Sequence, residues 1–397
     1  MKVVAVRDIS KQVRGVTYAK SDASAVPRSG YSPILRANNI GEHGLLLEDL
    51  IFVPNTKISQ KQRIVPNDIV VAASSGSISV VGKTAQARIG FEGGFGAFCK
   101  VLRPGPDVDP HYFGHYFRTS LYRHVISRLA AGVNINNLRN EHLDNLQIPL
   151  PPLAEQKRIA EILDAADALR AKRREALSEF DTLLQSTFLD MFGDPDTNPM
   201  RWESRAFGDI TAAKKLGLVR SSKEFGWDFT IPYVRMDAVT ATGEFLPDKV
   251  QRTEADEREL KDYRLKPGDF LFNTRNSKQL VGKVCVFPGP EGWLFNNNLM
   301  RIRFCVEVEP TVIAMQFRFG RVQRELEKRK AGTTSVFAVY WKSLQTLPIL
   351  VPPSDLQRRF ATIVESVEQQ KVRQQAHLAE LNTLFASLQS RAFRGDL

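Results

Sequence analysis

The chain has 397 residues, of which 43% are hydrophobic and 25% charged, and its formal net charge is +11 at pH 7. This length exceeds that of one ordinary domain, and the hydrophobic content is sufficient to bury sizeable cores. No apolar run reaches the ~18 residues that a membrane-spanning helix requires, which excludes a helical membrane protein.

The start of the chain and its cysteines predict the compartment. Lys2, Arg7 and Asp8 interrupt the apolar residues of the start, so we do not expect a secretory signal peptide. The sequence has three cysteines, Cys99, Cys285 and Cys305. They fit neither a disulfide framework nor a Cys-x-x-Cys metal pair. We therefore expect buried, reduced thiols in a cytoplasmic protein.

The first part of the chain is typical of β structure. Short apolar runs such as QRIVPNDIVVA (62–72) are broken by Gly, Pro and Asn. The segment 110–129 then places apolar side chains at helical spacing; these are Tyr112, Phe113, Tyr116, Phe117, Leu121, Val125 and Leu129. A turn and a short apolar strand are expected to follow this helical segment.

A double proline, Pro151-Pro152, precedes a long predicted helix over residues 155–192. Proline has no amide hydrogen and disfavours α geometry in the residue before it, so the pair holds the chain extended and stops the helix from growing backwards. One apolar stripe runs along the helix, formed by Ile159, Leu163, Ala166, Leu169, Leu177, Phe180, Leu184 and Phe188.

The second half repeats the first at an offset of about 200 residues, in the same order. "VPNDIV" (65–70) corresponds to "KPGDFL" (266–271), and Val-Gly-Lys occurs at both 81–83 and 281–283. Pro352-Pro353 then begins a second long helix over residues 355–397. An ordered series of this kind indicates an internal duplication.

The second helix carries its own apolar stripe, with a polar gap at residues 368–375. Its members are Phe360, Ile363, Val367, Leu378, Leu381, Phe385 and Leu388. Stripes this narrow on helices this long bury little against a globular body and favour a partner helix. The simplest partner for each helix is the other copy.

The basic excess lies outside these helices. Residues 155–192 carry a net charge of −2 and residues 355–397 a net charge of +1, which leaves +12 on the remaining segments. A polyanionic partner is therefore expected to bind the globular segments.

Two conserved-region motifs carry a resemblance to a known family. "PLPPLAEQKRIAEILDAADALRAKR" with "LLQSTFLDMFGDPDTNPMRW", and "VPPSDLQRRF" with "LNTLFASLQSRAFRGDL", resemble the two conserved regions of the DNA specificity subunit of Type I restriction–modification systems. With the duplication, the resemblance covers the whole chain. The second copy departs from the first at Ser354-Asp355-Leu356, where the first has Leu153-Ala154-Glu155.

The resemblance implies an α+β fold with internal duplication and pseudo-twofold symmetry. Two mixed α/β target-recognition domains (1–149 and 194–350) are joined by two helical regions (150–193 and 351–397) that pack as an antiparallel coiled coil. Each domain reads one part of a bipartite DNA target, and the helices set the spacing.

The resemblance also implies the partners. The subunit has no catalytic residues, metal or cofactor of its own. It binds double-stranded DNA and docks two methyltransferase subunits and, in the full complex, restriction subunits. Adenine methylation with S-adenosylmethionine and the use of ATP belong to those partners.

Three segments resemble catalytic motifs but lack residues that those motifs require. "SGSISVVGKT" (75–84) ends like a phosphate-binding loop, but Ser77 stands where that loop needs its first glycine. Strand-like sequence surrounds it, so we interpret it as a turn in a β domain. Asn198-Pro199 lacks the continuation of an adenine methyltransferase motif. His111 and His115 lack the glutamate of a zinc-hydrolase helix, which favours a packed or solvent-edge role.

Candidate DNA contacts are polar and basic residues on predicted loops. In the first half these are Lys20, Ser21, Ser74, Ser75, Ser77, Lys83, Asn134, Asn136 and Asn137. In the second half they are Arg220, Ser221, Lys223, Asn273, Thr274, Arg275, Asn276, Ser277, Lys278, Lys283, Thr333, Thr334 and Ser335. A solvated loop position is the alternative for each of them. For the whole chain, the alternative is a coiled-coil scaffold whose basic lobes bind another polyanion or a protein.

Overall fold

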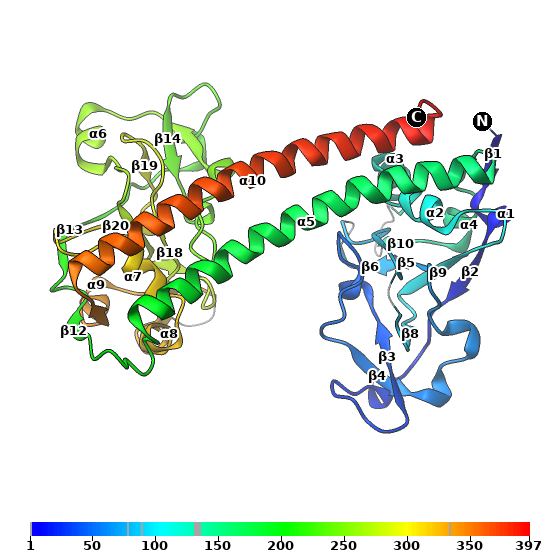
Figure 1. The fold of residues 1–397 in the computed structure, drawn as a ribbon, viewed down its shortest axis with the longest axis horizontal. Helices are drawn as coiled ribbons and strands as arrows, with labels where there is room; N and C mark the ends of the chain where they lie inside the picture. The colour runs from blue at the N-terminus through cyan, green and yellow to red at the C-terminus, as the bar shows by residue number, and fades with distance from the viewer. Residues whose placement is uncertain (1, 78, 89, 131–135, 333–334) are drawn as a thin grey trace. The chain divides into compact units, whose positions relative to one another are not determined.

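The computed structural model describes residues 2–77, 79–88, 90–130, 136–332 and 335–397. The chain divides into two compact units (Figure 1). Unit 1 comprises Met1–Glu175 and Gln375–Leu397, and unit 2 comprises Ala176–Gln374. Within the described part of the chain, no helix combines the length and the apolarity needed to span a bilayer.

Unit 1 contains a four-stranded antiparallel sheet in the order β2–β9–β5–β7, a three-stranded sheet in the order β4–β3–β8, and two short ribbons, β1–β11 and β6–β10. The strands are β1 (Lys2–Ala5), β2 (Ser10–Arg14), β3 (Tyr31–Leu35), β4 (Ile51–Pro54), β5 (Ile69–Ala72), β6 (Ser74–Ser75), β7 (Thr84–Gln86), β8 (Gly94–Phe95), β9 (Cys99–Pro104), β10 (Asn136–Asn137) and β11 (Gln147–Leu150). The helices are α1 (Val6–Ile9), α2 (Pro110–Tyr116), α3 (Ser120–Ala130), α4 (Asn140–Asp144) and the 3-10 turns η1 (Lys20–Asp22), η2 (Ala37–Asn39), η3 (Asn55–Lys57) and η4 (Gln60–Gln62).

Strand β5 lies at the centre of unit 1, and all four of its residues are buried. Ile69 and Val71 pack in the cluster formed with α2 and α3, whereas Val70 and Ala72 pack in the cluster formed with β3 and β8. The sheet is therefore covered on both faces, which explains why β5 is a continuous apolar run rather than an alternating one.

The predicted helix over 110–129 is two helices. Between α2 and α3, the Thr119 hydroxyl donates to Tyr116 O (2.8 Å) and accepts from the Tyr122 amide (3.0 Å), so a threonine cap separates them. Leu121 and Leu129 are 55% and 43% exposed. Helical spacing correctly identified α geometry but could not locate this break.

Unit 2 repeats the arrangement, with sheets in the order β13–β20–β16–β18 and β15–β14–β19, a ribbon β12–β23, and a small sheet β17–β22–β21. The strands are β12 (Glu203–Ala206), β13 (Thr211–Leu216), β14 (Ile231–Val234), β15 (Gln251–Thr253), β16 (Phe270–Asn273), β17 (Arg275–Asn276), β18 (Val284–Val286), β19 (Leu294–Phe295), β20 (Leu299–Phe304), β21 (Ala331–Gly332), β22 (Phe337–Ala338) and β23 (Pro348–Val351). The helices are α6 (Glu257–Tyr263), α7 (Pro310–Gln316), α8 (Gly320–Glu327), α9 (Trp341–Leu344) and the 3-10 turns η5 (Ser222–Glu224), η6 (Met236–Ala238) and η7 (Pro247–Lys249).

The duplication extends to individual contacts. Buried Asp68 pairs with Arg103 (2.8 Å) in unit 1, and Asp269 pairs with Arg303 (2.6 Å) in unit 2. The glycine of each Val-Gly-Lys segment has positive φ, 76° at Gly82 and 91° at Gly282. A Cβ at Gly82 would lie 2.6 Å from the Ile126 side chain, and a Cβ at Gly282 would lie 2.4 Å from Leu326. Both the turn and the helix packed on it therefore require glycine.

The two long helices are α5 (Leu153–Phe192) and α10 (Ser354–Arg394), and each is shared by both units. Unit 1 holds the start of α5 and the end of α10, so the two run antiparallel there, and unit 2 holds the complementary halves (Figure 1). The helix pairing confirms the expected partner. The polar gap in the second stripe does not interrupt α10.

The apolar stripes of α5 and α10 also pack against the globular part of each unit, called its lobe, that is, the unit without the two long helices. The sequence did not predict this packing. In unit 1, Ile159 and Leu163 of α5 share a core with Tyr112 of α2 and with Phe393 of α10. In unit 2, Phe188 of α5 packs with Phe360 of α10 and with residues of α7. Leu169, expected in the stripe, is 54% exposed. The boundaries of the four predicted domains stay a prediction.

Candidate functional site

The structure brings together candidate residues from distant parts of the first half. In the ribbon β6–β10, Asn136 pairs with Ser75 and Asn137 pairs with Ser74. The Leu138 amide continues the ribbon by donating to Ala73 O (2.8 Å). Ser77 follows in an exposed turn. Polar side chains more than 50 residues apart in sequence thus share one short β ribbon.

Unit 2 builds an equivalent ribbon at the same place. Arg275 pairs with Ala338 and Asn276 with Phe337, and β21 adds a third strand. The Val339 amide donates to Thr274 O (2.9 Å), as Leu138 does in unit 1. The side chain of Arg275 is exposed and has no hydrogen bond or ion pair to another described residue. These two equivalent ribbons are called the reading ribbons below.

Several candidates shape the second reading ribbon from within. Asn273 is buried, its side-chain Nδ2 donates to Asn298 O (3.0 Å), and its side-chain oxygen accepts from Asn276 Nδ2 (3.0 Å). The Thr274 hydroxyl also donates to Asn298 O (3.1 Å). Lys278 pairs with Glu327 (3.1 Å). Ser277 begins the following turn, and Ser335 is exposed.

A second pair of equivalent segments carries other candidates. Lys20 and Ser21 are exposed in η1, where the Asp22 carboxylate accepts from the Ala19 amide (2.9 Å). Ser221 and Lys223 are exposed at η5, where Glu224 accepts from the Ser221 amide (2.8 Å).

Two basic candidates already have partners inside unit 2. The Arg220 side chain is 9% exposed and donates to Glu259 Oε2 (2.5 Å). The Lys283 ammonium donates to Met236 O (3.0 Å) and to Val239 O. A phosphate contact by either would require these bonds to break. Lys83, the equivalent of Lys283, is exposed instead. Asn134, Thr333 and Thr334 lie outside the described residues, as does the side chain of Asn136.

Each double proline is joined to a glutamine clamp. Gln156 is buried, accepts from the Asp109 amide (2.8 Å) and donates to Pro151 O (2.9 Å). Gln357 repeats this with the Glu309 amide (2.9 Å) and Pro352 O (2.7 Å). The amide therefore satisfies otherwise unpaired backbone groups where the helix leaves the lobe. The sequence shows the Pro-Pro-x-x-x-Gln spacing but not these partners.

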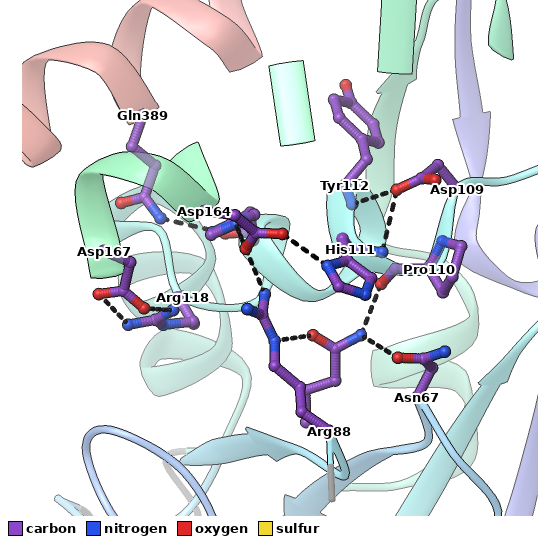
Figure 2. A network of polar contacts seen from close by, with 12 residues as sticks. Asn67, Arg88, Asp109, Pro110, His111, Tyr112, Arg118, Asp164, Asp167 and Gln389 are labelled. Atoms are coloured by element: carbon purple, nitrogen blue, oxygen red, sulfur yellow. Dashed lines mark hydrogen bonds and ion pairs between the residues drawn. The ribbon is translucent and has the colours of Figure 1, made fainter. Parts of the chain in front are cut away.

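A polar network ties the first lobe to α5 within unit 1 (Figure 2). Asp164 of α5 accepts from Arg88 Nη2 (2.7 Å) and lies 2.6 Å from His111 Nδ1 and 2.8 Å from His115 Nε2. Asp167, one turn further, pairs with Arg118 (2.7 Å). His115 is fully buried and His111 partly exposed, which confirms the packed and solvent-edge interpretation of the histidine pair.

Burial lowers the pKa of His115 from its ordinary value, although the Asp164 carboxylate opposes the shift. Burial would raise the pKa of Asp164, but hydrogen bonds from His115 and His111 and the charge of Arg88 hold it well below its ordinary value. Because a carboxylate only accepts, His115 donates through Nε2. Its Nδ1 is buried without a hydrogen-bond partner among the described residues, so a second proton would find no acceptor.

Replacing His115 with methionine, the residue at equivalent position 315, is expected to flatten the pH dependence of unfolding. The unfolded chain binds a proton at this histidine near pH ~6.5, and the folded protein binds it only at lower pH. The free energy of unfolding therefore has no penalty from His115 above that pH. It declines as pH falls below it, by up to ~1.4 kcal/mol per pH unit. Urea unfolding at pH 7 and pH 5.5 measures the difference. The same decline in His115→Met as in wild type would contradict this assignment, and His377→Gln, on an exposed part of α10, is the control.

The segment that resembles a phosphate-binding loop is a turn. Residues 79–82 turn between β6 and β7, and β7 begins at Thr84 with no helix behind it to present amides. Among the described residues, no group of three or more His, Cys, Asp or Glu is arranged to hold a metal ion.

Comparison with known proteins matches the whole chain. The family model for the Type I restriction modification DNA specificity domain matches residues 1–179 and again 199–382. The chain is 33% identical to the Type I restriction enzyme EcoKI specificity subunit of Escherichia coli K12, which covers 100% of this chain and 89% of that protein. It is 31% identical to the Type I restriction enzyme StySPI specificity subunit of Salmonella potsdam, and this match covers 99% of this chain and 88% of that protein.

The fold is similar to a solved one. The crystal structure of the Type-I restriction-modification system S subunit from M. genitalium aligns over 99% of this chain and 96% of that chain, with a TM-score of 0.57 and 16% identity. The repeated family match also confirms the duplication inferred from the sequence. The chain therefore belongs to the family of DNA specificity subunits of Type I restriction–modification systems.

Proposed function

We propose that each unit reads one half of a bipartite DNA target through its reading ribbon. The observation that carries this proposal is the equivalence of the two ribbons in backbone pairing and their difference in side chains. The first presents Ser74, Ser75 and Asn137, whereas the second presents Arg275, next to an Asn276 side chain that is bonded to Asn273. One frame with different polar side chains suits two unrelated half-sites.

The chain has no catalytic role in this proposal. Its partners are double-stranded DNA, two methyltransferase subunits that methylate adenine, and restriction subunits in the full complex. The duplication supports a stoichiometry of two, because each unit offers one copy of the same helix–lobe junction, centred on Gln156 or Gln357. The long helices serve as the spacer between the two half-sites.

Methylome sequencing tests the proposal directly. A host expressing this chain with its methyltransferase subunit is expected to carry methylated adenines in one two-part motif, with an unspecified spacer between the parts and one adenine on each strand. A host expressing the methyltransferase alone is the control. A continuous motif, or methylation that does not depend on this chain, would refute the bipartite reading.

A further inference from the structure

A basic groove of about 850 Å³ opens in unit 1, and its lining includes no residue of the reading ribbon itself. Its walls are the loop at residues 41–43, the turn before β7, the start of α3 and the last part of α10. All of these residues belong to unit 1. Phe117 and Phe385 are buried at its floor, and Leu121 is 55% exposed at its edge.

The groove has a large excess of positive charge. Five cationic side chains line it, namely Lys83, Arg118, Arg123, Arg170 and Arg394. Among the described lining residues, Glu42 supplies the one carboxylate. Asp167, just outside, is shared by Arg118 (2.7 Å) and Arg170 (2.9 Å). One carboxylate between two guanidinium groups leaves their combined charge positive.

Titration of neighbouring groups reflects this field. Burial lowers the pKa of His43, and the positive charges of Arg174, Arg170 and Arg118 lower it further. Burial also lowers the pKa of Arg170, where the charges of Arg118 and Arg174 oppose that of Asp167. A positive field of this kind attracts an anion.

The second repeat balances the corresponding charges. Counting from the two clamp glutamines, Arg170 corresponds to Lys371, whose side chain is 5% exposed. Lys371 contacts three carboxylates, Asp181 (3.3 Å), Glu244 (3.1 Å) and Glu368 (3.4 Å). Arg318, the equivalent of Arg118, also lies 3.5 Å from Asp181. The excess is therefore a property of the first repeat, and charge balance is possible on this frame.

The groove is joined to the first reading ribbon. Arg123 donates to Val81 O (3.0 Å) and Ser79 O (3.2 Å), which fixes the turn that follows β6. Lys83 follows that turn directly and projects from the groove's rim. A duplex on the ribbon would bring the adjoining phosphates toward these cations.

We propose that this groove binds the sugar–phosphate backbone of DNA beside the half-site read by unit 1. The inference rests on the proposed function and adds a second, sequence-independent contact to it. The cations at the rim neutralise phosphates, and the apolar floor accepts the less polar faces of the sugars. The contact raises affinity for every sequence and leaves base preference to the ribbon.

The test measures DNA binding by the double variant Lys83→Gln/Arg394→Gln in its complex with the methyltransferase subunits. The DNA is a duplex that carries the two-part motif identified by methylome sequencing. We expect affinity to fall about tenfold at 0.15 M salt, and the slope of log affinity against log salt to decrease by ~2, one for each lost phosphate contact. The methylome motif should not change. Circular dichroism checks folding, and the control Lys2→Gln/Lys157→Gln removes two exposed charges of unit 1 outside the groove.

Three other outcomes separate the possibilities. Unchanged affinity and salt slope, with normal methylation of a two-part motif, would overturn the groove proposal and leave the proposed function intact. Unchanged DNA affinity with loss of a subunit from the complex would also overturn it, and would assign the groove to an acidic protein segment. Absence of any two-part motif with the wild-type chain would instead refute the proposed function.

Discussion

Exchanging the second lobe for that of a relative is expected to change one half of the methylated motif completely and to leave the other half unaltered. The structure sets the junctions. β12 pairs with β23 from Glu203↔Val351 to Ala206↔Pro348, and Ile349 lies in the core of the lobe. The exchanged segment must therefore include both strands, so it runs from residue 200 to residue 351.

The recipient helices must retain their packing in this chimera. Val312 and Met315 of the lobe pack with Phe188 of α5 and Phe360 of α10, so these four positions keep the residues of the present chain. Methylome sequencing of the chimera measures the outcome, and the reciprocal exchange of the first lobe is the control. A change in both halves of the motif would show that the units do not read independently.

Lengthening both long helices by four residues is expected to widen the spacer by one or two base pairs and to leave both half-sites unchanged. Four residues add ~6 Å and slightly more than one helical turn. DNA advances ~3.4 Å per base pair, so this length corresponds to about two base pairs. An insertion of two residues would turn the second unit by roughly half a turn and is expected to abolish methylation.

The packing within each unit decides where the residues are inserted. Positions after Ala171 in α5 and after Ala376 in α10 preserve the Arg170–Asn382 hydrogen bond (2.7 Å) in unit 1 and the contacts of Lys371 in unit 2. Insertion into α5 alone would shift Phe188 against Phe360 and is expected to destabilise the protein. An unaltered spacer in the methylome of the folded double insertion would refute the role of the helices as a ruler.

Much of this fold could be predicted from the sequence because the duplication repeats strong local signals. A proline pair before a helical apolar stripe predicted α5 and α10, and the short apolar run at residues 62–72 predicted β5. The candidate residues at 74–77 and 273–278 were predicted to be loop contacts, and the structure places them in or beside equivalent ribbons. Whether they contact bases stays a prediction.

The polar interior could not be predicted, because its partners are far apart in the chain. From the sequence alone, Asp164 would be taken for a solvated helix residue, but in the structure it contacts Arg88 and His115. Arg220 and Lys283 were predicted to contact phosphates, but in the structure Arg220 pairs with Glu259 and Lys283 donates to Met236 O. Sequence spacing identifies the elements, whereas the state of a charge depends on which elements fold against it.

The order of the two units along the chain determines when each of them can fold during synthesis. Unit 2 is one uninterrupted segment, Ala176–Gln374, but unit 1 is completed by the last 23 residues, Gln375–Leu397. Those residues supply Phe385, Ala392 and Phe393 to the core around Tyr112 and Tyr116. During synthesis, the core around Tyr112 and Tyr116 therefore stays incomplete until residues 375–397 have left the ribosome. The first lobe can therefore complete its folding only after the whole of the second lobe, which precedes these residues in the chain, has been synthesised.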